Sequence, residues 1–279
     1  MQPALSQREY WSGKVGDDWA LFAERIDVML APITAAALDR AAFKTGEHVL
    51  DVGCGSGATS LQIARRVGAI GRVAGVDLSP QMLEVARRRA SQEGLAVDFF
   101  EADAGSADLG DRLDAVFSRL GVMFFAAPTE AFSHIRTFVR DNGRLSFVCW
   151  RPLAENIWAT IPLEAIQTML KAPLALADPD APGPYSLADE VKVRRILRDA
   201  GWRDIVMSRW DGLVPIGGGS SLDEAASFML RIGPCARAIG EQGLDAHDAK
   251  RRLMDRLTVH HGENGVALPG ACWLVSANA

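Results

Sequence analysis

The chain has 279 residues, of which 48% are hydrophobic, so it is long enough to bury a large core with insertions. Its 30 basic and 35 acidic residues give a formal net charge of -5, which argues against a nucleic-acid-binding surface. No basic start precedes an apolar core at the N-terminus, and no apolar run approaches a membrane span, so we expect a cytoplasmic protein. The four cysteines lack CxxC spacing, which predicts neither a metal site nor a disulfide framework.

Residues 1–43 are mostly helical in pattern and contain Trp11 and Trp19 ahead of an apolar set before Pro32. A helical segment ahead of the first strand of an open sheet often packs over the ligand edge. For either tryptophan alone, ordinary packing explains its presence as well as a ligand contact does. The segment is therefore expected to be helical, with its tryptophans as candidate contacts.

The centre of the chain is a glycine turn between a predicted strand and a predicted helix. His48–Val52 is a short β-prone run, and Gly53, Gly55 and Gly57 follow it. An apolar helical face comes next, formed by Ala58, Leu61, Ile63, Ala64 and Val67. Glycine allows backbone to approach a ligand closely, and the helix start behind the turn presents unpaired N–H groups. This pattern predicts a ligand cradle.

Two classes of ligand fit such a turn. Gly53, Gly55 and Ala58 also satisfy the dinucleotide fingerprint, and Asp77 follows at a suitable distance for a ribose carboxylate. An NAD(P)-dependent oxidoreductase therefore stays open on spacing alone. Asp51, two residues before the first glycine, would repel a diphosphate and attract an ammonium group. That charge favours S-adenosylmethionine (SAM), whose amino-acid end carries an ammonium.

Strands and helices alternate after the turn, which predicts an α/β protein with a parallel sheet covered on both faces. The second strand is Arg72–Asp77, and its helix has Ser79 as N-cap and closes at Gly94. A further helix is expected over about 128–141, and Arg87–Arg89 is expected to be one solvated helix face. The remaining strands of this half are predicted at Val97–Asp103, Asp114–Arg119 and Arg144–Trp150.

Ligands of open α/β sheets lie outside the carboxyl ends of the strands. Asp77 ends the second strand, where it can accept hydrogen bonds from both ribose hydroxyls of a nucleoside. A helix-capping or solvated aspartate is the alternative reading. Asp103 ends the third strand, and Ser118 and Arg119 end the fourth.

The run V-L-D-V-G-C-G-S-G resembles the first motif of class I SAM-dependent methyltransferases. The wider pattern is similar to their bacterial small-molecule branch, which includes the ubiquinone and menaquinone C-methyltransferases. The resemblance covers residues 44–150 well, the C-terminal strands acceptably and the insertions poorly. It implies a Rossmann-like sheet with an antiparallel final strand, helical cap insertions and SAM as cofactor.

The resemblance also implies roles for individual residues. Asp103 and Ala104 match the adenine contact, and Leu78 accompanies Asp77 in the cofactor set. Family members commonly use backbone at the position of Ser118, so its hydroxyl is expected to be incidental. The segment that ends at Trp19 is similar to a lid over bound cofactor.

By this reading residues 1–43 form an N-terminal helical lid, 44–150 the SAM-binding core and 151–186 a cap insertion. Residues 187–216 add a core helix and strand six, 217–268 a second helical cap insertion and 269–279 the final strand. The first insertion leaves the fifth strand at the ligand edge. That placement makes substrate-pocket candidates of three of its residues, Arg151, Asn156 and Trp158.

The predicted function is methyl transfer from SAM to a small, apolar or aromatic metabolite. Tryptophans in the lid and caps suggest an aromatic enclosure, and the S-R-L-G after the fourth strand lacks the N/D-P-P-Y/F motif of amine methylation. A non-catalytic SAM-binding sensor or partner protein is the second alternative. The acceptor, its attacking atom, a general base and the oligomeric state stay open.

Overall fold

A computed structural model describes residues 6–279 except 111, 175–177, 179 and 219–220. The outermost part of the predicted lid and short parts of both insertions lie outside these described residues. The central sheet has the strand order β3-β2-β1-β4-β5-β8-β6, with the short β7 paired to β8. Its strands are β1 (His48–Val52), β2 (Arg72–Asp77), β3 (Asp98–Glu101), β4 (Leu113–Arg119), β5 (Val139–Trp150), β6 (Arg203–Pro215), β7 (His261–Gly262) and β8 (Gly265–Asn278).

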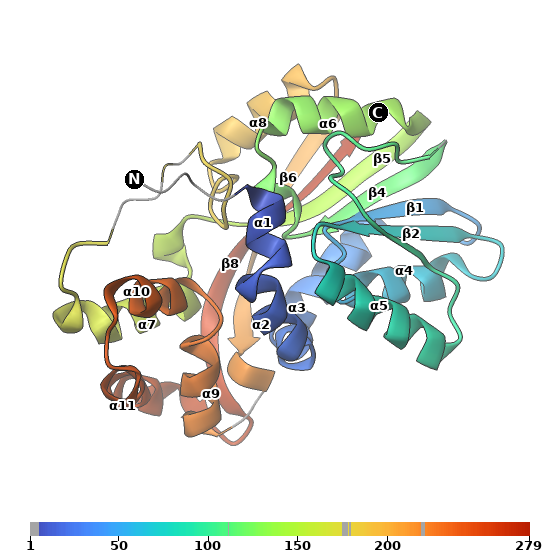
Figure 1. The fold of residues 1–279 in the computed structure, drawn as a ribbon. Coiled ribbons are helices and arrows are strands. Elements are labelled where there is room, and N and C mark those ends of the chain that lie inside the picture. The colour runs from blue at the N-terminus through green and yellow to red at the C-terminus, as the bar shows by residue number, and fades with distance from the viewer. Residues whose placement is uncertain (1–5, 111, 175–177, 179, 219–220) are drawn as a thin grey trace.

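The first five strands pair in parallel, whereas β8 runs antiparallel to both β5 and β6. Helices lie on both faces of the sheet, with α4 and α5 on one face and α6 and α8 on the other (Figure 1). This arrangement confirms the predicted Rossmann-like fold class. The helices of the core are α3 (Ala23–Ala41), α4 (Ala58–Val67), α5 (Pro80–Glu93), α6 (Pro128–Thr137) and α8 (Glu190–Asp199).

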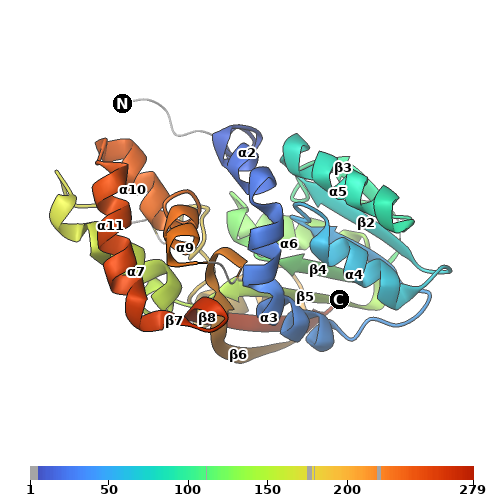
Figure 2. The ribbon, with the colours of Figure 1, turned by 90° about the horizontal axis from the view of Figure 1, so that it is seen from below.

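The remaining helices form the lid and the caps. The lid begins with α1 (Gln7–Ser12) and α2 (Lys14–Leu21). Seen from below, α7, α9, α10 and α11 gather at one end of the sheet, beside the lid helices (Figure 2). Their bounds are α7 (Ile157–Ile166), α9 (Leu222–Met229), α10 (Pro234–Gln242) and α11 (Ala246–Leu257). The caps enclose a small second core of their own, formed by Ile166, Cys235, Ala238, Leu244 and Ala249.

Local signals locate several helix ends correctly. The Ser79 hydroxyl accepts the N–H of Met82 at the start of α5, and Gly94 ends that helix in the left-handed conformation. Ser221 and Glu224 form a reciprocal capping box at α9. These ends depend on residues a few positions apart, which is why the sequence predicts them.

The helix predicted over 128–141 is too long. It ends at Thr137, and β5 begins at Val139. Asn142, with φ of 65°, lies inside the strand, where the pairing with β4 shifts between Leu113 and Ala115. The Asn-Gly signal therefore marks an irregularity within a strand.

The last two strands are long, and β8 begins at Gly265, ahead of the predicted start of the final strand at residue 269. They pair continuously from Val206–Ser276 to Pro215–Ala267, so part of the predicted second insertion belongs to β8. Pro269 reads as a strand breaker in the sequence. It is tolerated because β5 pairs with β8 only as far as Cys272. Pro269 therefore pairs with β6 on one side and needs no hydrogen bond to β5 on the other.

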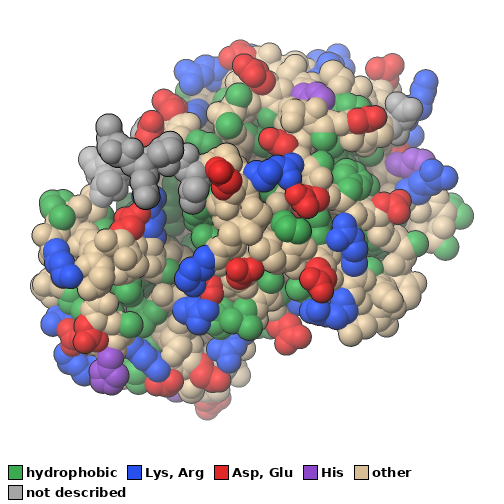
Figure 3. Space-filling model, viewed as in Figure 1, with side chains coloured by type: hydrophobic (Ala, Val, Ile, Leu, Met, Phe, Trp, Pro, Cys, Tyr) green, Lys and Arg blue, Asp and Glu red, His purple; other side chains and the backbone are tan. Residues whose placement is uncertain are grey.

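Within the described parts of the chain, no helix is both long and apolar enough to cross a membrane. Lysine, arginine and acidic side chains are interspersed over the face in Figure 3. The described residues also contain no group of three or more histidine, cysteine or acidic side chains that could hold a metal ion. All four cysteines are buried and free.

Candidate functional site

The glycine turn is bound to the end of β2 through its own backbone. Gly53 N and Cys54 N both donate to the carbonyl oxygen of Val76, at 2.8 and 3.1 Å. Gly53 has φ of +66°, and a Cβ at this position would lie 2.7 Å from the Cα of Gly121, beyond the end of β4. The turn thus needs glycine for its backbone conformation and for its close approach to a neighbouring loop.

Asp51 is fully buried behind this turn. Its Oδ2 atom accepts hydrogen bonds from the hydroxyls of Thr59 and Ser60 in the first turn of α4, both at 2.6 Å. Its Oδ1 atom is buried and has no hydrogen-bond partner among the described residues. Burial raises the pKa of this carboxyl to about 6, while the two hydroxyl bonds oppose the shift. An unpartnered, buried carboxylate oxygen suits a cationic donor such as an ammonium group.

Asp51 lies at the end of its strand, two residues before the first glycine, and α4 covers its side chain. Thr59 and Ser60 were not recognised as its partners. The signal lay in their polarity, because both are buried polar residues on a helix face that is otherwise apolar.

Asp77 lies at the end of the neighbouring strand, as predicted. Its two oxygens accept the backbone N–H groups of Gly55 and Ser79, each at 2.8 Å. Burial raises the pKa of Asp77, and the backbone hydrogen bonds act against that shift. The carboxylate therefore joins the glycine turn to the loop before α5. Leu78 lies half-buried between the two.

Asp103 and Ala104 follow β3, the next strand along the same edge of the sheet. Asp103 is exposed, and its Oδ1 accepts the N–H of Gly105 at 2.8 Å, which is a local turn contact. Ala104 is buried. Because β1, β2 and β3 are parallel neighbours, Asp51, Asp77 and Asp103 are brought to one edge of the sheet.

The hydroxyl of Ser118, expected to be incidental, is a structural junction. It donates to the carbonyl of Val52 at 2.8 Å and accepts the N–H groups of Gly121 and Val122, both at 3.2 Å. Ser118 thereby connects the end of β1 to the loop after β4. The bond to Val52 spans 66 positions of the sequence, so no local pattern indicated it.

The lid is attached directly above the loop that follows β2. Gln81 Nε2 donates to the carbonyl of Ser12 at 2.7 Å and to Asp17 at 3.0 Å. Trp11 makes edge contacts with Trp19 and with Phe124 after β4, with ring centroids 5.5 and 5.0 Å apart. The lid therefore touches the loops after β2 and β4.

Arg151 and Asn156, two of the predicted substrate-pocket candidates, are buried and make contacts within the scaffold. The Arg151 guanidinium is buried between Glu155 and Asp211. Asn156 Nδ2 donates to two carbonyls, while its Oδ1 accepts the N–H of Ala271 and the indole of Trp158. These bonds fasten the first cap to β8.

Trp158 stays partly accessible at the start of α7. Its ring lies against Trp150, with centroids 4.9 Å apart and planes at 43°. Its indole N–H is already used by Asn156 at 3.1 Å, which leaves the ring face for contacts. The four tryptophans Trp11, Trp19, Trp150 and Trp158 thus form two pairs, one in the lid and one at the first cap.

Tyr185 is a candidate that sequence reasoning missed. Its hydroxyl oxygen is buried and unpartnered within the described parts of the chain. The neighbouring Gly183 N and Ser186 Oγ both bond to the carbonyl of Met123, at 3.1 and 2.6 Å, which holds this segment beside the loop after β4. No local pattern distinguishes Tyr185 within its proline-rich insertion.

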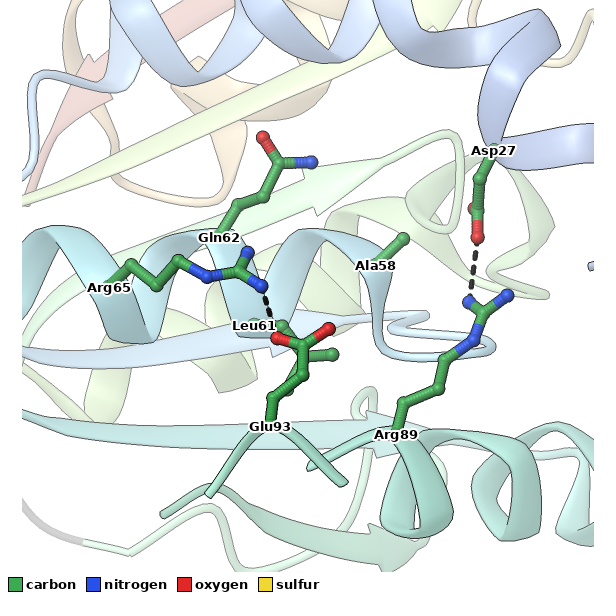
Figure 4. A pocket seen from close by; sticks show the side chains of 7 residues that line it. All are labelled: Asp27, Ala58, Leu61, Gln62, Arg65, Arg89 and Glu93. Atoms are coloured by element: carbon green, nitrogen blue, oxygen red, sulfur yellow. Dashed lines mark hydrogen bonds and ion pairs between the residues drawn. The ribbon is translucent and has the colours of Figure 1, made fainter. Parts of the chain in front are cut away.

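The arginine run also differs from its prediction as one solvated face. Arg87 and Arg88 are exposed, but Arg89 pairs with Asp27 of α3 at 2.7 Å (Figure 4). This pair lines a cavity of about 370 Å³ together with Ala58, Leu61, Gln62, Arg65 and Glu93. The cavity lies on the α4 and α5 side of the sheet, behind the glycine turn.

Comparison with known proteins shows what this part of the chain is similar to. Residues 49–143 match the family model described as a methyltransferase domain. The match covers the glycine turn, Asp51, Asp77 and Asp103. The predicted resemblance to methyltransferases is thereby confirmed for this part of the chain.

Curated relatives match over part of their length. An uncharacterised protein of Mycobacterium tuberculosis is 33% identical over 177 residues, which cover 58% of this chain and 61% of the relative. The aklanonic acid methyltransferase DauC of a Streptomyces species is 35% identical over 37% of this chain and 48% of its own. The demethylmenaquinone methyltransferase of Thermus thermophilus is 36% identical over 39% of this chain and 50% of its own. The alignments thus span less than two thirds of each of these relatives.

Solved structures support the fold over a larger part of the chain. The phosphoethanolamine N-methyltransferase 2 of Haemonchus contortus has a TM-score of 0.61 at 18% identity, covering 99% of this chain and 60% of that one. The [4+2]-cyclase SpnF has a TM-score of 0.56 at 18% identity, covering 98% and 96%. These two proteins have different activities, so the shared architecture alone does not define the reaction.

Proposed function

We propose that this protein is a SAM-dependent methyltransferase that acts on a small, apolar or aromatic metabolite. The observation that carries the proposal is the buried, unpartnered Oδ1 of Asp51 behind a glycine turn. A site for a phosphorylated dinucleotide would place a diphosphate near this carboxylate, whereas SAM brings an ammonium group. The match of residues 49–143 to a methyltransferase domain supports the same choice.

The proposed cofactor site is built from the strand ends described above. Asp51 would hold the ammonium group, the backbone at Gly53 and Gly55 would contact the amino-acid part, and Asp77 would accept the ribose hydroxyls. Leu78, Asp103 and Ala104 would surround the adenine, Trp19 would cover the cofactor, and Ser118 would keep the floor of the site in place.

When bound, SAM supplies a methyl group that its sulfonium has already activated. The contribution of this chain is then to position the acceptor and to exclude water. The lid contacts around Trp11 and the caps fastened through Asn156 provide the enclosure. No metal is required by the proposal.

The acceptor side is proposed to lie between the lid and the first cap. The partly exposed ring of Trp158, packed on the buried Trp150, offers apolar contact area, and the unpartnered hydroxyl of Tyr185 offers one hydrogen bond to a polar atom of the acceptor. Two relatives are named for methylating aklanonic acid and demethylmenaquinone, which is consistent with a small organic acceptor.

Ligand-induced thermal stabilisation tests the cofactor. S-adenosylhomocysteine (SAH), the demethylated product of SAM, is expected to raise the melting temperature through mass action, and NAD is not. Melting is followed by differential scanning fluorimetry at several ligand concentrations. Stabilisation by NAD without stabilisation by SAH would contradict the proposal.

Transfer itself is tested with radiolabelled SAM and fractionated small-molecule extract. Wild-type protein is expected to label an organic-soluble product, and Tyr185→Phe is expected to label less of it while binding SAH unchanged. A protein that binds SAH but labels nothing across the fractions would instead be a SAM-binding sensor or partner protein.

A further inference from the structure

One carboxylate, that of Asp27 in α3, lies between two arginines. Its Oδ2 is 2.7 Å from Nη1 of Arg89, and its Oδ1 is 3.5 Å from Nη2 of Arg119. The three side chains are only 22%, 18% and 11% exposed, respectively, so solvent screens their charges incompletely. Figure 4 shows Asp27 reaching across the cavity edge to Arg89.

The two arginines contact different parts of the cofactor site. Arg89 Nη1 also donates to Oγ and to the carbonyl of Ser56, at 3.0 and 3.3 Å, and Ser56 lies within the glycine turn. Arg119 is the last residue of β4, directly after Ser118, and its Nη1 donates to the hydroxyl of Thr34 at 3.0 Å. Asp27 therefore connects the helix below the lid to the turn and to the floor of the site.

The charge of Arg119 reaches the interior of the site. It lowers the pKa of Asp51, against the dominant effect of burial. A guanidinium whose field is felt at Asp51 would also repel the cationic groups of a ligand bound beside Asp51, which are the ammonium of SAM or SAH and, in SAM alone, the sulfonium. Asp27 is the acidic side chain that the structure places against Arg119 and Arg89, so it reduces this repulsion.

SAM and SAH differ in the charge that such a field would sense. The sulfonium of SAM carries a positive charge, and the thioether sulfur of SAH is neutral. Apart from this charge and the methyl group that carries it, the two molecules are the same. A contact that merely holds the turn in shape would affect the binding of both, whereas an electrostatic contribution would affect SAM more.

We propose that Asp27 is a positioning residue that offsets the charges of Arg89 and Arg119 and thereby sets the relative affinity for SAM and SAH. The inference rests on the proposed function, because it assumes that SAM occupies the glycine turn. Through Asp27, the α3 helix would make the protein bind the charged donor SAM more tightly, relative to the product SAH, than it would without this carboxylate.

The test compares Asp27→Asn with wild type by isothermal titration calorimetry, using SAM and SAH at low salt and at 0.5 M potassium chloride. Loss of one charge in a partly buried site is expected to raise the Kd of SAM about tenfold relative to that of SAH, as Coulomb's law implies for an effective dielectric near 20. The difference should shrink at high salt. Asp39→Asn is the matched control, because Asp39 lies on the same helix with an 80% exposed side chain.

A second variant keeps the inference testable if Asp27→Asn folds poorly by circular dichroism. Arg119→Gln removes the opposing cation and should shift the ratio in the reverse direction, toward tighter SAM binding relative to SAH. Equal weakening of both ligands in Asp27→Asn, or an unchanged ratio in Arg119→Gln, would overturn the inference. Wild-type protein that binds neither ligand would instead contradict the proposed function.

Discussion

The carboxyl group of Asp51 is buried at an energetic disadvantage that a bound cation would relieve. Its pKa of about 6 lies above the ordinary value of 3.8, and burial is the cause. The folded protein therefore keeps a proton that the unfolded chain releases between these pH values. The contribution of this group to the free energy of unfolding accordingly falls as the pH rises through this window.

Ligand binding should show the opposite pH dependence. The ammonium group of SAH needs the ionised carboxylate, so the Kd of SAH is expected to rise by about tenfold for each pH unit below 6 and to level off above pH 7. Calorimetry between pH 5 and 8 measures this profile. The Asp51→Asn variant should bind SAH weakly, and its Kd should depend little on pH. Any remaining pH dependence of the Kd would report the titration of Asp77. An equally steep profile in this variant would assign the titration to another group.

Single residues elsewhere in the site have roles that depend on distant partners. Ser118 bonds to Val52, and Arg89 bonds to Asp27, which is 62 positions away in the sequence. Local sequence patterns carry no information about such pairs. This is why the positions of Asp77 and Asp103 at strand ends could be predicted, whereas the partners of Ser118 and Arg89 could not.

At the scale of elements, the lid is positioned by a helix that packs closely on the loop after β2. Gly16 of α2 is buried, and a Cβ at this position would lie 2.7 Å from the hydroxyl oxygen of Ser79 and closer still to the carbonyl of Trp11. The neighbouring Gln81 bonds to Ser12 and anchors the same helix pair. The lid thus approaches the cofactor edge only because position 16 carries no side chain.

Gly16→Ala is expected to displace α2 from Ser79 and to weaken SAH binding by about tenfold, a change of about 1.4 kcal/mol in binding free energy. Calorimetry gives the affinity, and urea unfolding gives the stability. Gly240→Ala is the matched control, since nothing lies within 4 Å of an added Cβ in α10. This control should bind normally and unfold at slightly higher urea concentration, because alanine favours a helix more than glycine. Unchanged SAH affinity in Gly16→Ala would show that the lid is not needed for binding.

At the scale of the whole molecule, the buried side-chain amide of Asn156 links the first cap to the sheet. Asn156 is fully buried, and its side chain bonds to the carbonyls of Arg151 and Pro152, to the N–H of Ala271 and to the indole of Trp158. Removing it leaves several buried polar groups without partners. The stability of the cap is therefore coupled to that of the sheet, although the cap also has a small hydrophobic core of its own.

Asn156→Ala is expected to lower the free energy of unfolding by about 3 kcal/mol, since each buried group left without a partner costs about 1–3 kcal/mol. Urea denaturation followed by tryptophan fluorescence measures this change. Ser227→Ala serves as control, because its exposed hydroxyl bonds to the carbonyl of Asp223 in its own helix. A midpoint within experimental error of wild type would contradict the role assigned to Asn156.

The sequence by itself determined the strand, glycine turn and helix around Asp51 and the helix cap at Ser79. These features depend on residues close together in the chain, where hydrophobic period and turn chemistry act directly. The β1 and β2 bounds match the predicted ones for this reason.

Only the tertiary structure decided which of the candidate side chains remain available at the site. The side chain of Asp51 is covered by α4, and one of its oxygens has no partner among the described residues. The side chain of Asn156 is fully hydrogen-bonded within the scaffold. Tyr185 has a buried, unpartnered hydroxyl in a segment without a recognisable sequence pattern. Each of these outcomes is set by contacts between elements far apart in the chain. The free energy of a buried polar group depends on such contacts, and no local sequence period encodes them.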